Sequence, residues 1–212
     1  TTLFRSSTIE SISSLINSLF VIILPLIILP SIIESIVIES IKKEPTVVVV
    51  SAMSGVTDQL LMLAQSASQG NEAYKTIIQH IEQKHLDAVR ALLPIQQQSG
   101  TLSLVKQLLN ELESNCEGLF MLRELSMRMQ DKIISYGEIL SSKIISAAFE
   151  SNGMQQQWVD SRNLIKTDSK YFNAVVHKAS TDSAIQAYFA SKDNNAFDVY
   201  IVPGFIASDK EG

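Results

Sequence analysis

The chain has few of the residues on which disulfides and metal sites depend. It contains one cysteine, Cys116, and three histidines in 212 residues. A single cysteine excludes an internal disulfide and suits a reducing compartment such as the cytosol. No histidine or cysteine neighbours Cys116, so we predict an inert thiol. His80, His85 and His177 show no metal-ligand spacing, and we expect them at the surface and expect no metal site among them.

Basic clusters and the common nucleotide-binding signature are also missing. The 17 Lys and Arg residues are outnumbered by 22 Asp and Glu residues, which gives a formal charge of −5. The basic residues form only pairs such as Lys42-Lys43, which argues against a nucleic-acid partner. No G-K-[ST] string is present, so the chain has no Walker A motif. No repeat or Pro/Gly/Ser-rich linker divides residues 45–212, which predicts one domain there.

The first 44 residues differ in composition from the rest. The chain opens with TTLFRS and no methionine, and a common sequencing adapter encodes this string, so we hypothesise a scar. Residues 19–33 are almost wholly apolar and contain Pro25 and Pro30. Three interpretations stay open for this stretch: a non-native segment, a buried helix or a membrane element. The apolar run is about 15 residues long, whereas a spanning helix needs roughly 20, which disfavours the membrane.

Residues 45–212 read as an alternation of strands and helices. The string TVVVV at 46–50 is apolar on both faces, as is typical of a central parallel strand. Apolar periodicity and stop signals then predict four helices, a short strand, a fifth helix and a last strand. Their ranges are 58–67, 74–93, 102–125, 130–152, 157–159, 181–190 and 198–202, with a polar break at 96–100. This order predicts an α/β fold, a parallel sheet flanked by helices with a long helical insertion.

The octet SAMSGVTD, residues 51–58, follows the first of these strands directly. Ligands of α/β proteins bind beyond the carboxyl ends of parallel strands, and a helix start offers unpaired amides and a positive dipole end. Ser51, Ser54 and Thr57 add hydroxyl groups, and Gly55 permits close approach of a ligand to the backbone. The octet therefore suits a phosphate or a carboxylate. The alternative is a plain helix cap provided by Ser54 or Thr57.

Two further residues stand out against apolar surroundings. Glu138, in SYGEILSSK, lies among small and apolar residues and could receive an ammonium group. It could equally be a first-turn acid favoured by the helix dipole. Phe205, in VPGFIASDKEG, lies where a predicted strand opens toward a site. Its alternative is an ordinary place in the core.

Taken together, four stretches resemble the aspartokinases, members of the amino acid kinase family. VVVVSAMSGVTD resembles the strand and loop written V-V-S-A-x-x-G-x-T-[ND], and SYGEILSS resembles the motif G-E-x-L-S. WVDSRNLIKTD resembles the strand and loop that follow, and VPGFIASDKEG the strand that enters a G-F-x-G-like turn. The resemblance covers residues 45–212 in order. The helical insertion at 71–129 is similar to that of bifunctional aspartokinase–homoserine dehydrogenases.

The resemblance implies a partial amino acid kinase fold, in which residues 45–212 are the substrate-binding N-terminal lobe. It implies transfer of the ATP γ-phosphate, with Mg²⁺, to the side-chain carboxylate of L-aspartate, the first step of lysine, threonine and methionine biosynthesis. Ser51 would lie near the transferred phosphate, and the Ala52 backbone and the Thr57 hydroxyl would contact aspartate. Glu138 would pair with the substrate ammonium, and Phe205 would pack on the substrate. A cytoplasmic homo-oligomer is expected for the parent enzyme.

The chain departs from the family pattern at both ends. It lacks the string K-F-G-G-T-S, which holds phosphates, and it stops before the expected G-R-G-G-S-D segment. We therefore expect this polypeptide to be inactive, although its parent is an active kinase. The alternatives are another kinase of the same fold, such as glutamate 5-kinase or acetylglutamate kinase, and a non-catalytic helical or membrane-associated protein. The Glu138 motif and the helical insertion disfavour the other kinases.

Overall fold

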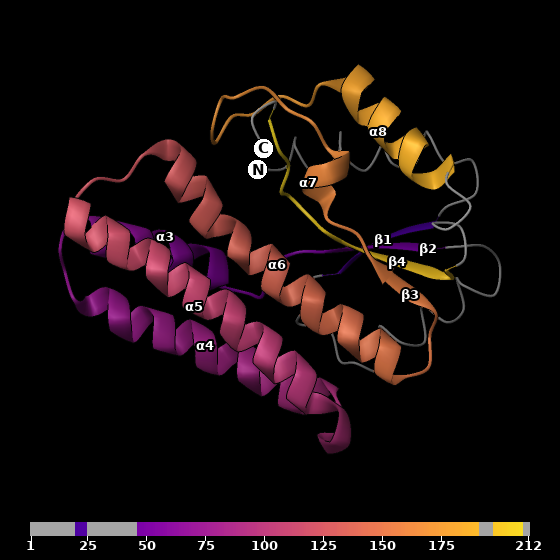
Figure 1. Cartoon of the computed structure of the whole chain (residues 1–212), viewed down its shortest axis with the longest axis horizontal. Coiled ribbons are helices and arrows are strands. Elements are labelled where there is room, and N and C mark those ends of the chain that lie inside the picture. Colours follow the sequence, from indigo (N-terminus) through magenta and orange to yellow (C-terminus); the bar gives the residue numbers. More distant parts are fainter. Residues whose placement is uncertain (1–19, 25–45, 191–196, 210–212) are drawn as a thin grey trace.

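A parallel sheet forms the centre of the fold. The computed structural model describes residues 20–24, 46–190 and 197–209, and for 20–24 the backbone alone (Figure 1). The strands are β1 (Phe20–Leu24), β2 (Thr46–Val50), β3 (Gln156–Trp158) and β4 (Val199–Pro203). They lie in the order β1-β2-β4-β3 and every pairing is parallel. The predicted α/β class and parallel sheet are therefore confirmed.

The two faces of the sheet are covered by different helices. Side chains that alternate along a strand point to opposite faces, and here both sets are buried, as the apolar run at 46–50 predicts. Val48, Val50 and Ile201 pack with Ile145 and Phe149 of α6 (Met127–Ser151). The opposite face packs against α7 (Ser161–Leu164) and α8 (Lys178–Ala190). Its buried side chains are Val47, Tyr200, Val202, Leu164, Ile165 and Ile185. The fold is thus a three-layer sandwich.

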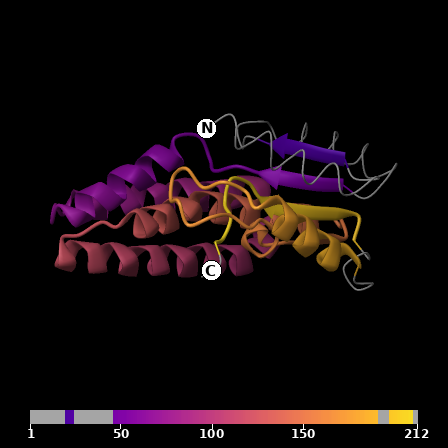
Figure 2. The same ribbon diagram turned by 90° about the horizontal axis from the view of Figure 1, so that it is seen from above.

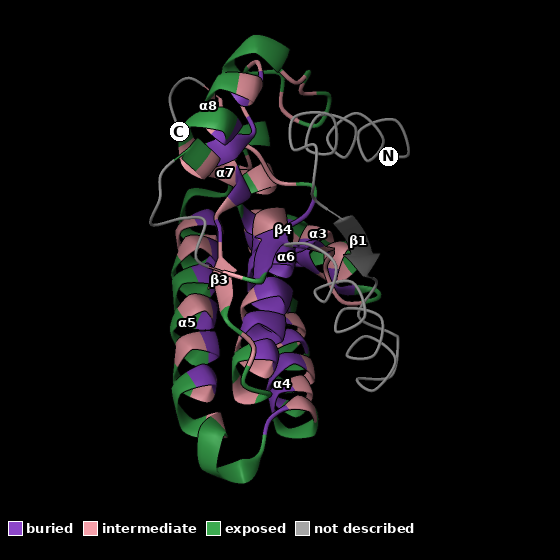
Figure 3. Ribbon diagram, turned by 90° about the vertical axis from the view of Figure 1, so that its right-hand side faces the viewer, coloured by how far each residue is buried: buried purple, intermediate pink, exposed green. Residues whose placement is uncertain are grey.

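A second core lies in a bundle of long helices to one side of the sheet (Figure 2). The bundle consists of α3 (Val56–Ser68), α4 (Ala73–Leu92), α5 (Gln98–Leu122) and α6. Each helix buries one apolar stripe, which is the pattern of spacing that predicted them. α6 belongs to both the bundle and the sandwich, and it is the most extensively buried helix in Figure 3. It therefore connects the helical insertion to the sheet.

The structure corrects three details of the sequence reading. Residues 95–97 form a short 3₁₀ turn, η1, and α5 already begins at Gln98, so the polar break is helical in part. The four-residue helix α7 is too short to show an apolar period. Phe20–Leu24 pairs with β2 as a parallel strand, which differs from the buried helix considered for this stretch. The rest of residues 1–44 lies outside the described residues.

His85 was expected at the surface and is instead fully buried in α4. His80 and His177 are exposed, as expected. The Nδ1 atom of His85 lies 2.7 Å from the Ile81 carbonyl oxygen, so Nδ1 must carry the hydrogen. Among the described residues, Nε2 has no hydrogen-bond partner. The prediction for His85 was wrong because a neutral imidazole that bonds its own helix can occupy an apolar stripe.

Burial also explains the state of Cys116. The thiol is completely shielded within the bundle. Burial, with a smaller contribution from the charge of Glu113, raises the pKa of Cys116 to about 12. A thiol that stays protonated at neutral pH is a poor nucleophile, so the buried position supports the predicted inert role.

We predict that His85 makes the stability of the chain depend on pH. Burial lowers the pKa of its imidazole below the ordinary 6.5, against an opposing effect of the Ile81 carbonyl. Below pH 6.5 the unfolded chain therefore binds a proton that the folded chain does not. The free energy of unfolding should fall with decreasing pH, by at most about 1.4 kcal/mol per pH unit from this group. Urea unfolding between pH 7.5 and 5 measures it.

His85→Gln should reduce that slope, because glutamine does not titrate. His80→Gln, on the exposed face of the same helix, should leave it unchanged. Equal slopes in the wild type and His85→Gln would contradict this account.

A second prediction concerns the contact between α6 and the loop after β2. A Cβ added at Gly137 would lie 2.9 Å from the Cβ of Ala52 and 3.2 Å from Cδ1 of Leu60. Overpacking typically costs about 1–3 kcal/mol, which exceeds the gain of about 1 kcal/mol from replacing a helical glycine with alanine. Gly137→Ala should therefore lower the free energy of unfolding by about 1 kcal/mol.

Gly118 of α5 provides a matched control, because nothing lies within 4 Å of a Cβ added there. Gly118→Ala should stabilise the chain by up to about 1 kcal/mol through helix propensity alone. Thermal unfolding of the two variants measures both effects. If both variants gained stability, the close contact at Gly137 would be disproved.

Candidate functional site

The loop that follows β2 leaves the first turn of α3 without a side-chain cap. Gly55 is the N-cap residue and adopts the left-handed conformation, with φ 75°, and no side-chain hydrogen bond caps the helix. The prediction's alternative, a cap by Ser54 or Thr57, is therefore wrong. The Val56 amide bonds the Met53 carbonyl at 3.0 Å, which closes a turn just before the helix. The loop thus presents helix-start amides beside half-buried Ser51, Ala52 and Thr57.

Helix α6 packs directly against this loop. Gly137 lies so close to Ala52 that a side chain at Gly137 would collide with it. One helical turn further on, the Ser141 hydroxyl donates a hydrogen bond of 2.8 Å to the Ser51 carbonyl oxygen. Residues 51–56 and residues 137–141 therefore form a single contact, although about 85 positions separate them in the sequence.

Glu138 lies in the middle of α6, between Gly137 and Ser141 in the stretch that contacts the loop. Only 5% of its surface is exposed. The first-turn alternative is wrong, because α6 begins at Met127. A buried carboxylate is costly unless hydrogen bonds or an opposite charge compensate it, so its position among small residues is typical of a specific site rather than of a helix surface. The ammonium-binding role that the resemblance implies for Glu138 stays a prediction.

Phe205 is exposed and backbone-strained at the end of β4. Its φ is 61°, in the left-handed region that bulky residues rarely adopt. It is 45% exposed, so the alternative of an ordinary core residue is wrong. Such strain costs about 1–3 kcal/mol and persists only where surrounding contacts enforce it. Here the Gly204 amide bonds the Val50 carbonyl at 2.7 Å and the Ser161 hydroxyl bonds the Ile206 carbonyl at 3.0 Å.

The loop after β3 supports the same edge of the sheet. The Arg162 guanidinium holds Asp160 with three hydrogen bonds. Nε donates to Oδ1 at 2.9 Å and to Oδ2 at 3.2 Å, and Nη2 donates to Oδ2 at 2.6 Å. Burial opposes ionisation of Asp160, but Arg162 outweighs it and holds the pKa of that carboxyl below its usual value. Lys166 donates to the Ser208 hydroxyl at 2.9 Å. The β3 loop thereby fastens the segment that follows Phe205.

Sequence reasoning missed two residues that hold the octet. Ser141 lies in the string SYGEILSS, but the sequence assigned it no role. Nothing in the pattern around it indicates that its hydroxyl bonds the carbonyl of a residue 90 positions away. The second residue is Lys84, which precedes the buried His85 in α4. Its ammonium group donates a hydrogen bond to the Ser54 carbonyl oxygen. Nothing in the local pattern of α4 distinguishes Lys84 from other surface lysines.

The structure brings the predicted residues to one edge of the sheet. Ser51 and Ala52 follow β2, Phe205 follows β4, and Glu138 lies on the segment of α6 that contacts Ala52. Thr57 lies in the first turn of α3, next to Val56, whose Cγ1 would be 3.5 Å from a Cβ at Gly137. Thr57 and Glu138 are thus each next in sequence to a residue of the contact between α3 and α6, and that they share a site stays a prediction.

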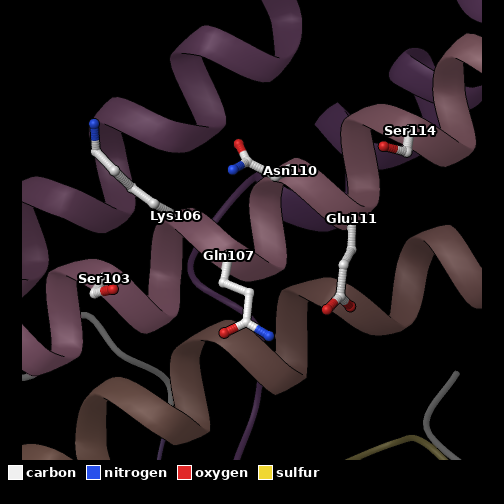
Figure 4. Close-up of a pocket in the computed structure, with 6 residues that line it drawn as sticks. All are labelled: Ser103, Lys106, Gln107, Asn110, Glu111 and Ser114. Carbon is white, nitrogen blue, oxygen red and sulfur yellow. The ribbon is translucent and has the colours of Figure 1, made fainter.

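A hollow elsewhere on the surface does not coincide with this site. It has a volume of about 430 Å³ and lies along α5 (Figure 4). All its lining residues are polar and come from that one helix: Ser103, Lys106, Gln107, Asn110, Glu111 and Ser114. Lys106 is partly engaged by Glu82 at 3.7 Å. An open, single-helix hollow lacks the convergence of several elements that is typical of ligand sites.

Within residues 20–24, 46–190 and 197–209, no group of three His, Cys, Asp or Glu side chains could hold a metal ion. In the same part of the chain, no helix is both long and apolar enough to cross a membrane.

Sequence comparison finds relatives that are aspartokinases, alone or fused to a homoserine dehydrogenase. The bifunctional aspartokinase/homoserine dehydrogenase 2 of Zea mays, a chloroplastic protein, is 24% identical over 166 residues, which are 78% of this chain. The chain spans 18% of that relative's length. The aspartokinase of Chlamydia pneumoniae is 28% identical over 173 residues, 81% of this chain and 34% of the relative.

The fold has a counterpart among solved structures. Aspartokinase III of E. coli, in complex with aspartate and ADP, superposes with a TM-score of 0.71 at 22% identity. The superposition covers 84% of this chain and 37% of that one. At this identity the likeness shows a shared fold.

The sequence model of the amino acid kinase family matches residues 13–212. The match includes part of the segment 1–44, whose non-native origin stays a prediction. A match over nearly the whole chain, together with the parallel sheet and the loop after β2, shows that this protein belongs to the amino acid kinase family.

Proposed function

We propose that the chain is the substrate-binding lobe of an aspartate kinase, which transfers the γ-phosphate of ATP to the side-chain carboxylate of L-aspartate. The observation that carries the proposal is the contact of residues 137–141 of α6 with the loop after β2. From that contact we infer that the Glu138 carboxylate and the helix-start amides of α3 face one ligand. L-Aspartate needs both, because it carries an ammonium group and two carboxylates.

In this proposal each end of the substrate meets the opposite charge. Glu138 receives the ammonium group, and a charge-assisted hydrogen bond of this kind contributes about 1.5–3 kcal/mol. The Ala52 amide and the Thr57 hydroxyl bind carboxylate oxygens, assisted by the positive end of the α3 dipole. Phe205, exposed at the end of β4, packs on the substrate. Its backbone is held in the left-handed conformation by the bonds to the neighbouring residues Gly204 and Ile206.

The nucleotide approaches the same edge of the sheet from the side of Ser51. Ser51 lies near the transferred phosphate and contributes its hydroxyl. Phosphoryl transfer depends mainly on positioning and neutralisation of charge, so no covalent residue is needed. We propose that Mg²⁺ enters with the phosphates of ATP, whose developing charge it would neutralise. The ADP in the E. coli aspartokinase III structure supports a nucleotide in this fold.

Further properties of the parent enzyme are also proposals. Relatives of both the bifunctional and the monofunctional type match, so a fused homoserine dehydrogenase is proposed on the likeness of the helical insertion alone. The resemblance to aspartokinases also leads us to propose a role in lysine and threonine biosynthesis. On the same ground we propose a homo-oligomeric parent enzyme and a cytoplasmic location. The plant relative is named chloroplastic. The relatives described above are aspartokinases, which disfavours glutamate 5-kinase and acetylglutamate kinase.

Titration calorimetry with L-aspartate and with succinate tests the proposal on this chain. Glu138→Gln keeps the shape of the side chain and removes its charge. It should weaken L-aspartate binding roughly 10- to 100-fold, the equivalent of one charge-assisted hydrogen bond. Succinate has both carboxylates and no ammonium group, so its affinity should not fall.

Glu150→Gln is the matched control, because Glu150 lies on the same helix and is exposed. It should leave both affinities unchanged. If Glu138→Gln weakened succinate and L-aspartate equally, Glu138 would not receive the ammonium group. If wild-type chain bound L-aspartate no better than L-lysine, the proposed substrate would be wrong.

A further inference from the structure

The loop after β2 is held by side chains that grip its carbonyl oxygens. The Ser51 carbonyl accepts the Ser141 hydroxyl at 2.8 Å, and the Ser54 carbonyl accepts the Lys84 ammonium. The two donors come from α6 and α4, and they reach across 90 and 30 positions of sequence. The loop is therefore fastened near each end by a different helix of the bundle.

Fixing a carbonyl fixes the amide that follows it. A trans peptide unit is planar, so the C=O of one residue and the N–H of the next point in opposite directions. The bond from Ser141 to Ser51 therefore orients the amide of Ala52. In the same way, the bond from Lys84 to Ser54 orients the amide of Gly55, the N-cap of α3.

These amides are available to a ligand. Among the described residues, no backbone carbonyl accepts a hydrogen bond from the amides of residues 52–55. Buried backbone amides nearly always have a partner, and residues 51–53 are half-buried. Ser54 and Gly55 are exposed, so an approaching ligand can reach the amides on this side of the loop.

We propose that Ser141 and Lys84 are positioning residues, which hold the Ala52 and Gly55 amides in the direction that a substrate carboxylate requires. Ser141 is the stronger of the two, because it is completely buried, whereas Lys84 reaches an exposed carbonyl. The role in substrate binding rests on the function proposed above. The orientation of the two amides does not, and it can be measured without any ligand.

Ser142 offers a control that separates positioning from general packing. Both serines are completely buried on adjacent positions of α6. Ser141 contacts the Ser51 and Glu138 carbonyls, at 2.8 and 3.2 Å. Ser142 contacts the Ile139 carbonyl at 3.1 Å and accepts a bond of 3.0 Å from Trp158. Each alanine variant loses two hydrogen bonds, and only one of them releases the loop.

Backbone ¹⁵N relaxation of the ligand-free chain is the first measurement. In Ser141→Ala the order parameter of the Ala52 amide should fall from the rigid range, about 0.85, to below about 0.6. In Ser142→Ala it should stay rigid. Lys84→Met should loosen the Gly55 amide, and Lys84→Arg should restore it. We call the two bonds, from Ser141 to Ser51 and from Lys84 to Ser54, the clamp. Because Lys84 is partly exposed, the two Lys84 variants test the clamp even if Ser141→Ala does not fold.

Calorimetry with L-aspartate is the second measurement. Ser141→Ala should lower the affinity roughly 10-fold, the equivalent of one hydrogen bond. Ser142→Ala should leave the affinity unchanged. If the wild type failed to bind L-aspartate, the proposed function would be wrong. The relaxation data would still test the orientation of the two amides, because they are measured without a ligand. The clamp is disproved if Ser141→Ala leaves the Ala52 amide rigid, or if both serine variants loosen it equally.

Discussion

The close contact between Gly137 of α6 and Ala52 is the constraint on which the rest of the site depends. A Cβ at Gly137 would approach that of Ala52 to 2.9 Å, so only a glycine allows the helix to pass the loop at this distance. The same approach brings the Ser141 hydroxyl to the Ser51 carbonyl. Glu138, between these two residues, is thereby carried to the carboxyl end of the sheet. A larger residue at position 137 would move all three groups away together.

This contact also explains how the helical bundle and the sheet together position one site. α6 packs on the sheet through Ile145 and Phe149 and on the bundle through its N-terminal half. The bundle also holds the loop after β2 through Lys84 of α4, whose ammonium group bonds the Ser54 carbonyl oxygen. On the other side, the β3 loop holds the strained turn at Phe205 through Ser161. The proposed site lies between these contacts, whose side-chain donors would not themselves touch a ligand.

Much of the fold could be predicted from the sequence, because its signals are local. The valines at 47–50 indicated a strand buried on both faces, and the apolar stripes gave the long helices to within a few residues of their observed ends. The misses have physical reasons. His85 is buried because its imidazole bonds the Ile81 carbonyl of its own helix. The strand at Phe20–Leu24 is short and apolar, and periodicity alone does not separate such a run from a helix.

The candidate site was less accessible to such reasoning, because its parts meet only in the tertiary structure. Resemblance pointed to Glu138 and Phe205, whereas Ser141 and Lys84 act through bonds across 90 and 30 positions. A crystal structure of the chain with L-aspartate tests the central claim most directly. We expect the ligand beside the loop at 51–57, with its ammonium about 3 Å from a Glu138 carboxylate oxygen. Ligand bound along α5, or with its ammonium turned away from Glu138, would contradict the account.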